Sequence, residues 1–165
     1  MFRTIQDFLT VWKEERASTV KIFSTLTDDV LSQKKNEHVR SLGRLAGHIT
    51  ETLREMPHRA GLSVEYKEEL LNFSSVAEMV GHYGAACDVL EKKVAAEWTD
   101  AMLDQTVPMY GEEWKRGMVL LSLVTHQAHH RAQMTVLMRL VGLKVPGVYG
   151  PSYEEWSAFG MPAME

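Results

Sequence analysis

The chain has 165 residues, 45% of them hydrophobic, which suits one soluble globular domain with a single core. Its formal net charge of −4 provides no basic face, so general nucleic-acid binding is not expected. The single cysteine, Cys87, excludes an internal disulfide and fits a reducing compartment. We therefore expect residues 1–165 to form a single domain.

The N-terminal segment lacks the pattern of a secretory signal, because polar and charged residues interrupt residues 1–16 every few positions. The longest apolar run, residues 118–124, is far too short to span a bilayer. These features predict a cytoplasmic protein with neither a membrane nor a nucleic acid as its partner.

Two helices are predicted in the first part of the chain. Residues 2–24 carry an apolar stripe at helical spacing, with charged residues on the opposite side. Ser41 has the position of an N-cap for a second helix, which is expected to stop before Pro57. Gly43 and Gly47 within this helix either permit a close approach of another segment or weaken the helix.

Two further helices are predicted in the second part of the chain. Residues 57–73 are expected to be a connection that contains at most a short helical turn. The capping-box pattern between Ser75 and Glu78 opens a third helix that runs to about Trp98. Residues 115–141 form the longest periodic run, and Gly142 is well placed to cap its C-terminus.

Four helices, without a convincing strand or a sequence repeat, predict an all-α four-helix bundle. Residues 25–40 and 99–114 are long enough to cross the bundle, so we expect long crossover connections. The apolar tail, residues 144–165, is expected to pack on the bundle or on a partner. Bundles of this kind place metal and ligand sites in the core, between facing helices.

Two histidines interrupt the apolar stripe of the last long helix. His126 and His130 lie one turn apart, at positions where leucine would be expected. Burying two unpaired imidazoles is costly, because each needs a hydrogen-bond partner. Two imidazoles at i and i+4 can instead share a metal ion. The sequence therefore predicts a metal site on this face of the helix.

A third protein ligand is required, because catalytic zinc-like sites usually have three protein ligands and one open position. His48 and His82 are the helical candidates, and spacing alone does not choose between them. His38 and His58 fall in predicted connections and are weaker candidates. His129 lies on a small, partly polar flank of the last long helix, so we expect it to be a neighbour of the site and not a ligand.

The sequence does not identify catalytic residues. Gln133 is a weak candidate that could hydrogen-bond a ligand histidine or a bound water. Arg131 could bind an anionic substrate, although a surface arginine is the first interpretation. Glu51 is interpreted first as a solvent-facing carboxylate, with orientation of His48 or a role as a base as the alternatives. Cys87 lies on an apolar seam and is interpreted as packing and not as a nucleophile.

Several better-known sites are excluded by their patterns. The sequence lacks the His-Glu-x-x-His of zinc proteases, the paired Glu-x-x-His of di-iron bundles and any Cys-x-x-Cys. A haem-binding bundle that uses His126 and a facing histidine fits the spacing poorly.

Two stretches resemble the DinB/YfiT-like family of metal-binding four-helix bundles. One is Leu45-Ala-Gly-His48-Ile in the second helix. The other is His126-Gln-Ala-His129-His130-Arg131-Ala-Gln133 in the last, followed by Leu-Val-Gly142. The order and spacing of the helices also match, so the likeness covers nearly the whole chain. The family commonly has glycine where this chain has Ala132, a small departure that leaves the histidines untouched.

The resemblance implies that His48, His126 and His130 hold a divalent metal, with zinc or nickel expected first and iron, manganese or copper as alternatives. Some family members look like thiol-dependent transferases or isomerases, and others are described as metal-dependent hydrolases. We therefore expect a metal-dependent enzyme, S-transferase-like or hydrolase-like, that acts on a small molecule with a low-molecular-weight thiol as candidate co-substrate. The resemblance also implies a homodimer. The alternative is a non-catalytic, metal-binding structural dimer.

Overall fold

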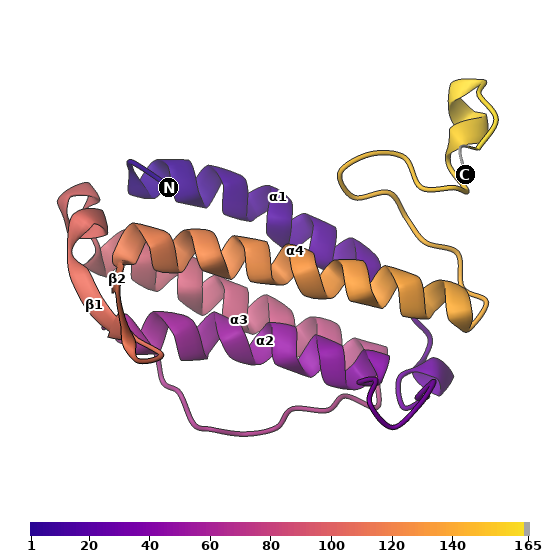
Figure 1. Ribbon diagram of the computed structural model, residues 1–165, viewed down its shortest axis with the longest axis horizontal. Helices are drawn as coiled ribbons and strands as arrows, with labels where there is room; N and C mark the ends of the chain where they lie inside the picture. Colours follow the sequence, from indigo (N-terminus) through magenta and orange to yellow (C-terminus); the bar gives the residue numbers. More distant parts are fainter. Residues whose placement is uncertain (164–165) are drawn as a thin grey trace.

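The computed structural model describes residues 1–163, and four long α-helices form the body of the protein (Figure 1). They are α1 (Ile5–Phe23), α2 (Leu42–Arg59), α3 (Val76–Glu97) and α4 (Arg116–Leu140). Fully buried side chains from all four helices fill the space between them, among them Trp12, Ile49, Leu90 and Leu123. The predicted all-α bundle and the order of its helices are confirmed. None of the helices within residues 1–163 is long and apolar enough to cross a membrane.

The helices follow a crossed path through the bundle. α1 and α2 each pack against both α3 and α4, so α1 lies diagonally opposite α2, and α3 opposite α4. The connections after α1 and after α3 therefore cross the bundle, as predicted. α2 and α3 are parallel neighbours, so the extended segment 62–74 that connects them returns along the length of the bundle on its outside (Figure 1). α2 and α4 run antiparallel and face each other.

The ends of the helices follow from local side-chain and backbone chemistry. Thr4, Ser41 and Ser75 each accept a hydrogen bond from the backbone N–H three residues further on, as N-caps do. Gly142 has φ of 82°, a left-handed conformation that glycine adopts without strain. Its N–H donates to the carbonyl of Arg139, which ends α4 as predicted.

α2 passes through Pro57 and ends at Arg59, so the prediction of a stop before Pro57 is wrong. A proline lacks the N–H that would bond one turn back, but here the loss is confined to the last turn. Gly61 follows the helix end in a left-handed conformation with φ of 85°, and its N–H donates to the carbonyl of His58. His58 therefore belongs to α2, and the segment after Gly61 is extended without a helical turn.

A β-hairpin lies between α3 and α4, so the expectation of a chain without strands is wrong there. After a short 3-10 helix, β1 (Thr106–Met109) pairs antiparallel with β2 (Glu112–Lys115). Tyr110 and Gly111 form the turn with φ of 53° and 87°, the positive values that two-residue hairpin turns need. Strands of four residues are too short for the alternation of apolar and polar side chains to be recognised.

The C-terminal segment packs on the bundle in its first part only. Val145 is buried, and Lys21 of α1 donates a hydrogen bond to the Gly147 carbonyl. Tyr153 and Phe159 further along are 62% and 63% exposed. The expected packing of the tail on the bundle is therefore observed near α4 and not at its aromatic end.

Candidate metal centre

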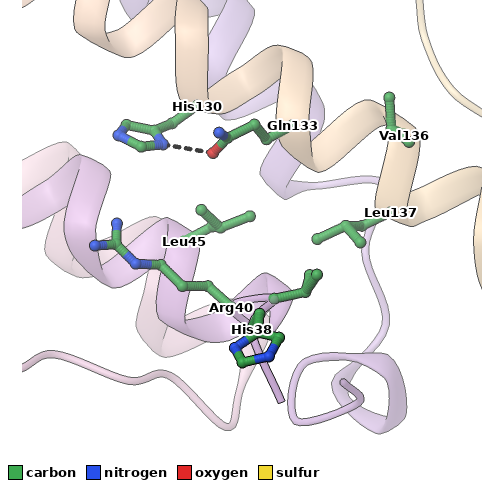
Figure 2. Close-up of a pocket in the computed structure, with 8 residues that line it drawn as sticks. His38, Arg40, Leu45, His130, Gln133, Val136 and Leu137 are labelled. Carbon is green, nitrogen blue, oxygen red and sulfur yellow. Dashed lines mark hydrogen bonds between the residues drawn. The ribbon is translucent and has the colours of Figure 1, made fainter. Parts of the chain in front are cut away.

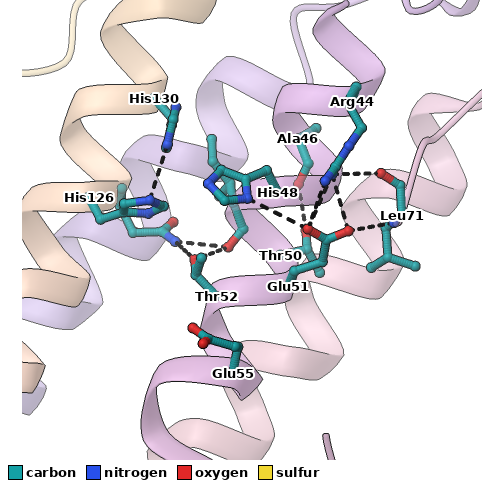
Figure 3. A network of polar contacts seen from close by, with 12 residues as sticks. Arg44, Ala46, His48, Thr50, Glu51, Thr52, Glu55, Leu71, His126 and His130 are labelled. Carbon is teal, nitrogen blue, oxygen red and sulfur yellow. Dashed lines mark hydrogen bonds and ion pairs between the residues drawn. The ribbon is translucent and has the colours of Figure 1, made fainter. Parts of the chain in front are cut away.

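The structure brings His48, His126 and His130 together between α2 and α4 (Figure 3). One ring nitrogen of each histidine lies within 4.8 Å of the other two. The Nε2 atoms of His126 and His130 are 3.1 Å apart. Two ligand nitrogens on one tetrahedral zinc ion are about 3.3 Å apart when each Zn–N bond is about 2.0 Å. The spacing of His126 and His130 therefore suits a shared metal ion, and His48 lies close enough to be a third ligand.

Gln133 fixes the orientation of the His130 ring (Figure 2). Its Oε1 accepts a hydrogen bond from Nδ1 of His130 at 2.8 Å, and its Nε2 donates to Nε2 of His129 at 3.0 Å. A neutral imidazole protonated at Nδ1 carries its lone pair on Nε2. His130 thus presents a metal-binding nitrogen to the cluster, and His129 lies one hydrogen bond further out.

Glu51 lies beside His48 on the opposite side of the cluster (Figure 3). Its side chain is only 14% exposed, so the interpretation as a solvent-facing carboxylate is wrong. One carboxylate oxygen lies 3.6 Å from Nδ1 of His48. Arg44 fixes this carboxylate with two N–H···O contacts of 3.1 Å, and the backbone N–H of Leu71 donates to it as well. Nε2 of His48 is therefore the nitrogen left for a metal.

Gly43 and Gly47 allow the extended segment 71–73 to lie against α2. A Cβ atom at Gly47 would lie 2.0 Å from the carbonyl oxygen of Leu71, and one at Gly43 would lie 2.2 Å from that of Phe73. Because these neighbours are backbone atoms, no side-chain rotation could relieve the clash. Close approach therefore explains both glycines, and it delivers the Leu71 N–H that anchors Glu51.

Replacing Glu51 with glutamine should weaken metal binding by about 10- to 100-fold, the usual effect of losing an outer partner of a ligand histidine. The variant keeps the side-chain volume but removes the charge that lies beside His48 and pairs with Arg44. Competition with a chromophoric chelator measures the zinc affinity. Glu69→Gln is the control, because Glu69 is an exposed carboxylate of the same region. Equal affinities of Glu51→Gln and the wild type would show that Glu51 does not support His48.

Burial keeps the three histidines neutral. Burial, reinforced by the neighbouring His130, lowers the pKa of His48 to about 4. The same two causes lower the pKa of His126 to about 4. Burial also lowers the pKa of His130, and its hydrogen bond with Gln133 acts in the opposite direction. Since neutral imidazole is the form that binds metal, the three histidines could hold a metal ion at neutral pH without first losing protons.

The metal-free protein should lose stability as the pH falls from 6.5 towards about 4. Because the folded-state pKa values are lowered, the unfolded chain binds more protons in this window. Each histidine contributes at most about 1.4 kcal/mol per pH unit, reduced by solvent screening. Thermal unfolding of chelator-treated protein across this range measures the slope. His126→Leu should flatten it, and His38→Asn at an exposed position should not; equal slopes for all three proteins would contradict the lowered pKa.

Two other predicted candidates lie away from the cluster. His82 is exposed on α3, where its ring lies 5.4 Å from that of Phe73. Arg131 is 2% exposed, so its interpretation as a surface arginine is wrong. Its guanidinium binds Glu15 of α1 and Tyr149 of the C-terminal segment. Arg131 thus ties the bundle together and does not face the histidines.

Gln127 is a residue of the site that sequence patterning misses. It is fully buried, donates a hydrogen bond to the Ile49 carbonyl and accepts one from the Tyr83 hydroxyl. These contacts hold α4 against α2 and α3 immediately beside His126. The signal for this role was a polar residue in a buried row of α4 between Val124 and Met134.

Two cavities open beside the histidines. The first, about 550 Å³, lies between the start of α2 and the second half of α4, with His130 and Gln133 on one side and Arg40 and Leu45 on the other (Figure 2). The second, about 530 Å³, is lined by His48 and His126 together with side chains of the extended segment and the hairpin. Both volumes lie in the range of small-molecule sites. A small molecule can therefore approach the cluster from two sides.

The fold and the histidines define a four-helix bundle with a three-histidine group that could hold a metal ion. The chain belongs to the DinB family, whose model matches residues 1–164. The protein YrdA of Bacillus subtilis, described as uncharacterized, is 35% identical over 164 residues, which cover 99% of this chain and 98% of YrdA.

Two solved structures extend the comparison. A DinB-like protein from Bacillus cereus ATCC 10987 is 36% identical, with a TM-score of 0.82 over 90% of this chain and 100% of that one. The DinB-like protein YjoA of Bacillus subtilis is 16% identical, with a TM-score of 0.66 over 84% of this chain and 96% of that one, and shares the fold. The predicted family membership is confirmed.

Proposed function

We propose that the protein is a metal-dependent enzyme that acts on a small molecule, with His48, His126 and His130 as ligands of a divalent metal such as zinc or nickel. The observation that carries this proposal is the three-histidine group beside two cavities. Three protein ligands leave a coordination position open, as in catalytic zinc sites. When bound, the metal supplies Lewis acidity, which lowers the pKa of a water or thiol ligand.

The protein's own residues orient the histidines, and the nucleophile is a thiol or a water molecule that binds from solution. Gln133 hydrogen-bonds the ring of His130, and the Glu51 carboxylate lies 3.6 Å from the ring of His48. Cys87 is not the nucleophile, because burial raises the pKa of its thiol to about 12. A low-molecular-weight thiol as co-substrate makes the reaction transferase-like, and water makes it hydrolase-like. A thiol co-substrate and the unpaired Cys87 both fit the reducing cytoplasm, where we place the protein.

Protein purified without chelator or affinity-tag nickel should contain about one equivalent of metal per chain. The reason is that three neutral, pre-oriented imidazoles bind a divalent ion without first losing protons. Elemental analysis measures the content, before and after adding zinc, nickel or manganese. Less than about a tenth of an equivalent under all these conditions would sink the proposal.

A second candidate is a non-catalytic, metal-binding homodimer. The exposed aromatic side chains of Tyr153 and Phe159 favour it, since they offer apolar surface for self-association. This candidate predicts retained metal, a dimer in sedimentation and no turnover in panels of thiol-conjugation and hydrolysis assays. A rate that depends on added metal would favour the enzyme instead.

A further inference from the structure

Arg40 lines both cavities, and no other residue among those described is shared between them. It lies two residues before α2, where its side chain extends alongside Leu45 on the side of His130 (Figure 2). Arg44 and Arg59, the other arginines of the second cavity, are engaged by Glu51 and Glu55. Arg40 is exposed, and none of the ion pairs within residues 1–163 includes it. Arg40 is therefore a cation with a free guanidinium at the junction of the cavities.

Arg40 favours an anion in the first cavity, whose lining within residues 1–163 contains no carboxylate, whereas the second cavity is also lined by Glu51, Glu55, Glu68 and Glu69. Arg40 lines the first cavity together with His130 and the second together with His48 and His126. Three neutral imidazoles bring no negative charge to a divalent ion. An unpaired guanidinium beside such an ion repels it, and an anionic ligand between the two is attracted to both. This step rests on the proposed metal site.

The lining of the first cavity defines the rest of the ligand. Leu45 of α2 and Val136 and Leu137 of α4 form an apolar wall next to Arg40 and His130. Val136 is 59% exposed, so it has apolar surface to cover. A guanidinium matches a carboxylate through two parallel hydrogen bonds, and one arginine balances one negative charge. A monoanion with an aliphatic chain therefore fits better than a phosphate dianion.

We propose that Arg40 binds the carboxylate of a small aliphatic acid beside the three histidines, with the apolar chain of the acid between Leu45, Val136 and Leu137. Arg40 thus recognises the substrate and sets the class of molecule that the site accepts. The contact between Arg40 and the carboxylate does not itself require a metal.

Titration of the zinc-loaded, ¹⁵N-labelled protein with hexanoate, followed by NMR, tests this assignment. Zinc is diamagnetic, so the amide signals of Val39, Leu45 and Val136 report directly on the cavity. Hexanoate should shift these signals and bind at least about tenfold more tightly than acetate, because it buries four further methylene groups. It should also bind about tenfold more tightly than hexan-1-ol, which has the chain without the charge.

Three variants separate charge from apolar contact. Arg40→Gln should weaken hexanoate binding by about tenfold or more. Lys35→Gln removes a charge from the same connection but lines neither cavity, and should leave the affinity unchanged. Val136→Ser should weaken binding of hexanoate but not of acetate. Equal binding of hexanoate and hexan-1-ol, an unchanged affinity in Arg40→Gln, or tighter binding of inorganic phosphate would overturn the assignment.

The same titration on chelator-treated protein distinguishes this inference from the proposed function. Hexanoate binding that depends on Arg40 in a protein that takes up no metal would overturn the metal proposal and support the role of Arg40. If the protein takes up a full equivalent of metal but Arg40→Gln binds hexanoate as tightly as the wild type, only the role of Arg40 is overturned.

Discussion

The His126→Ala variant should lose tight zinc binding, with a fall in affinity larger than the roughly 100-fold that the loss of an outer partner causes. Removal of His126 leaves His48 and His130 as two ligands on different helices. Two protein ligands do not complete the usual three-ligand arrangement of an open site. Competition with a chromophoric chelator measures the affinity.

Thermal unfolding gives a second measure of the same variant. Zinc at 100 times its dissociation constant should stabilise the wild type by about 2.7 kcal/mol, and this gain should vanish in His126→Ala. His82→Ala is the matched control, since His82 is exposed on α3 and lies against Phe73. A His82→Ala variant that loses zinc, or a His126→Ala variant that keeps it, would show that the ligand set is wrong.

The sequence predicts correctly those parts of the site that depend on the spacing of residues within one helix. His126 and His130 are one turn apart, so their common face follows from helix geometry alone. N-caps at Ser41 and Ser75 are likewise local. The choice of His48 over His82 was not local, because it depends on which sides of α2 and α3 meet α4 in a crossed bundle. That choice came from the family resemblance.

The parts that sequence reasoning missed depend on contacts between distant segments. The position of Glu51 in its own helix predicts a solvent-facing side chain. The segment that covers it contains Leu71, 20 residues further along the chain, whose N–H donates to the Glu51 carboxylate. Arg131 looks like a surface residue on α4, and its partner Glu15 lies 116 residues away. A periodic pattern describes one helix at a time, so it cannot report a polar group that another element buries.

Replacing Arg131 with methionine should destabilise the protein by about 3–5 kcal/mol, the usual cost of leaving one member of a buried ion pair alone. Glu15 is 6% exposed and would keep its charge without the guanidinium. Thr19 and Tyr149, which also bond to Arg131, would each lose a partner. Urea denaturation measures the free energy of unfolding, and the melting temperature should fall by roughly 10 °C.

Two further variants separate the buried charge from the general effect of losing an arginine. Arg139 forms an exposed ion pair with Glu154, so Arg139→Met should cost less than about 1 kcal/mol. Adding Glu15→Leu to Arg131→Met removes the buried carboxylate that has lost its partner, and it should recover much of the stability. Zinc affinity should remain unchanged in Arg131→Met, because Arg131 contacts α1 and the C-terminal segment and not the histidines. An Arg131→Met protein that keeps its stability but loses zinc would place Arg131 in the site, where the sequence first made it a candidate.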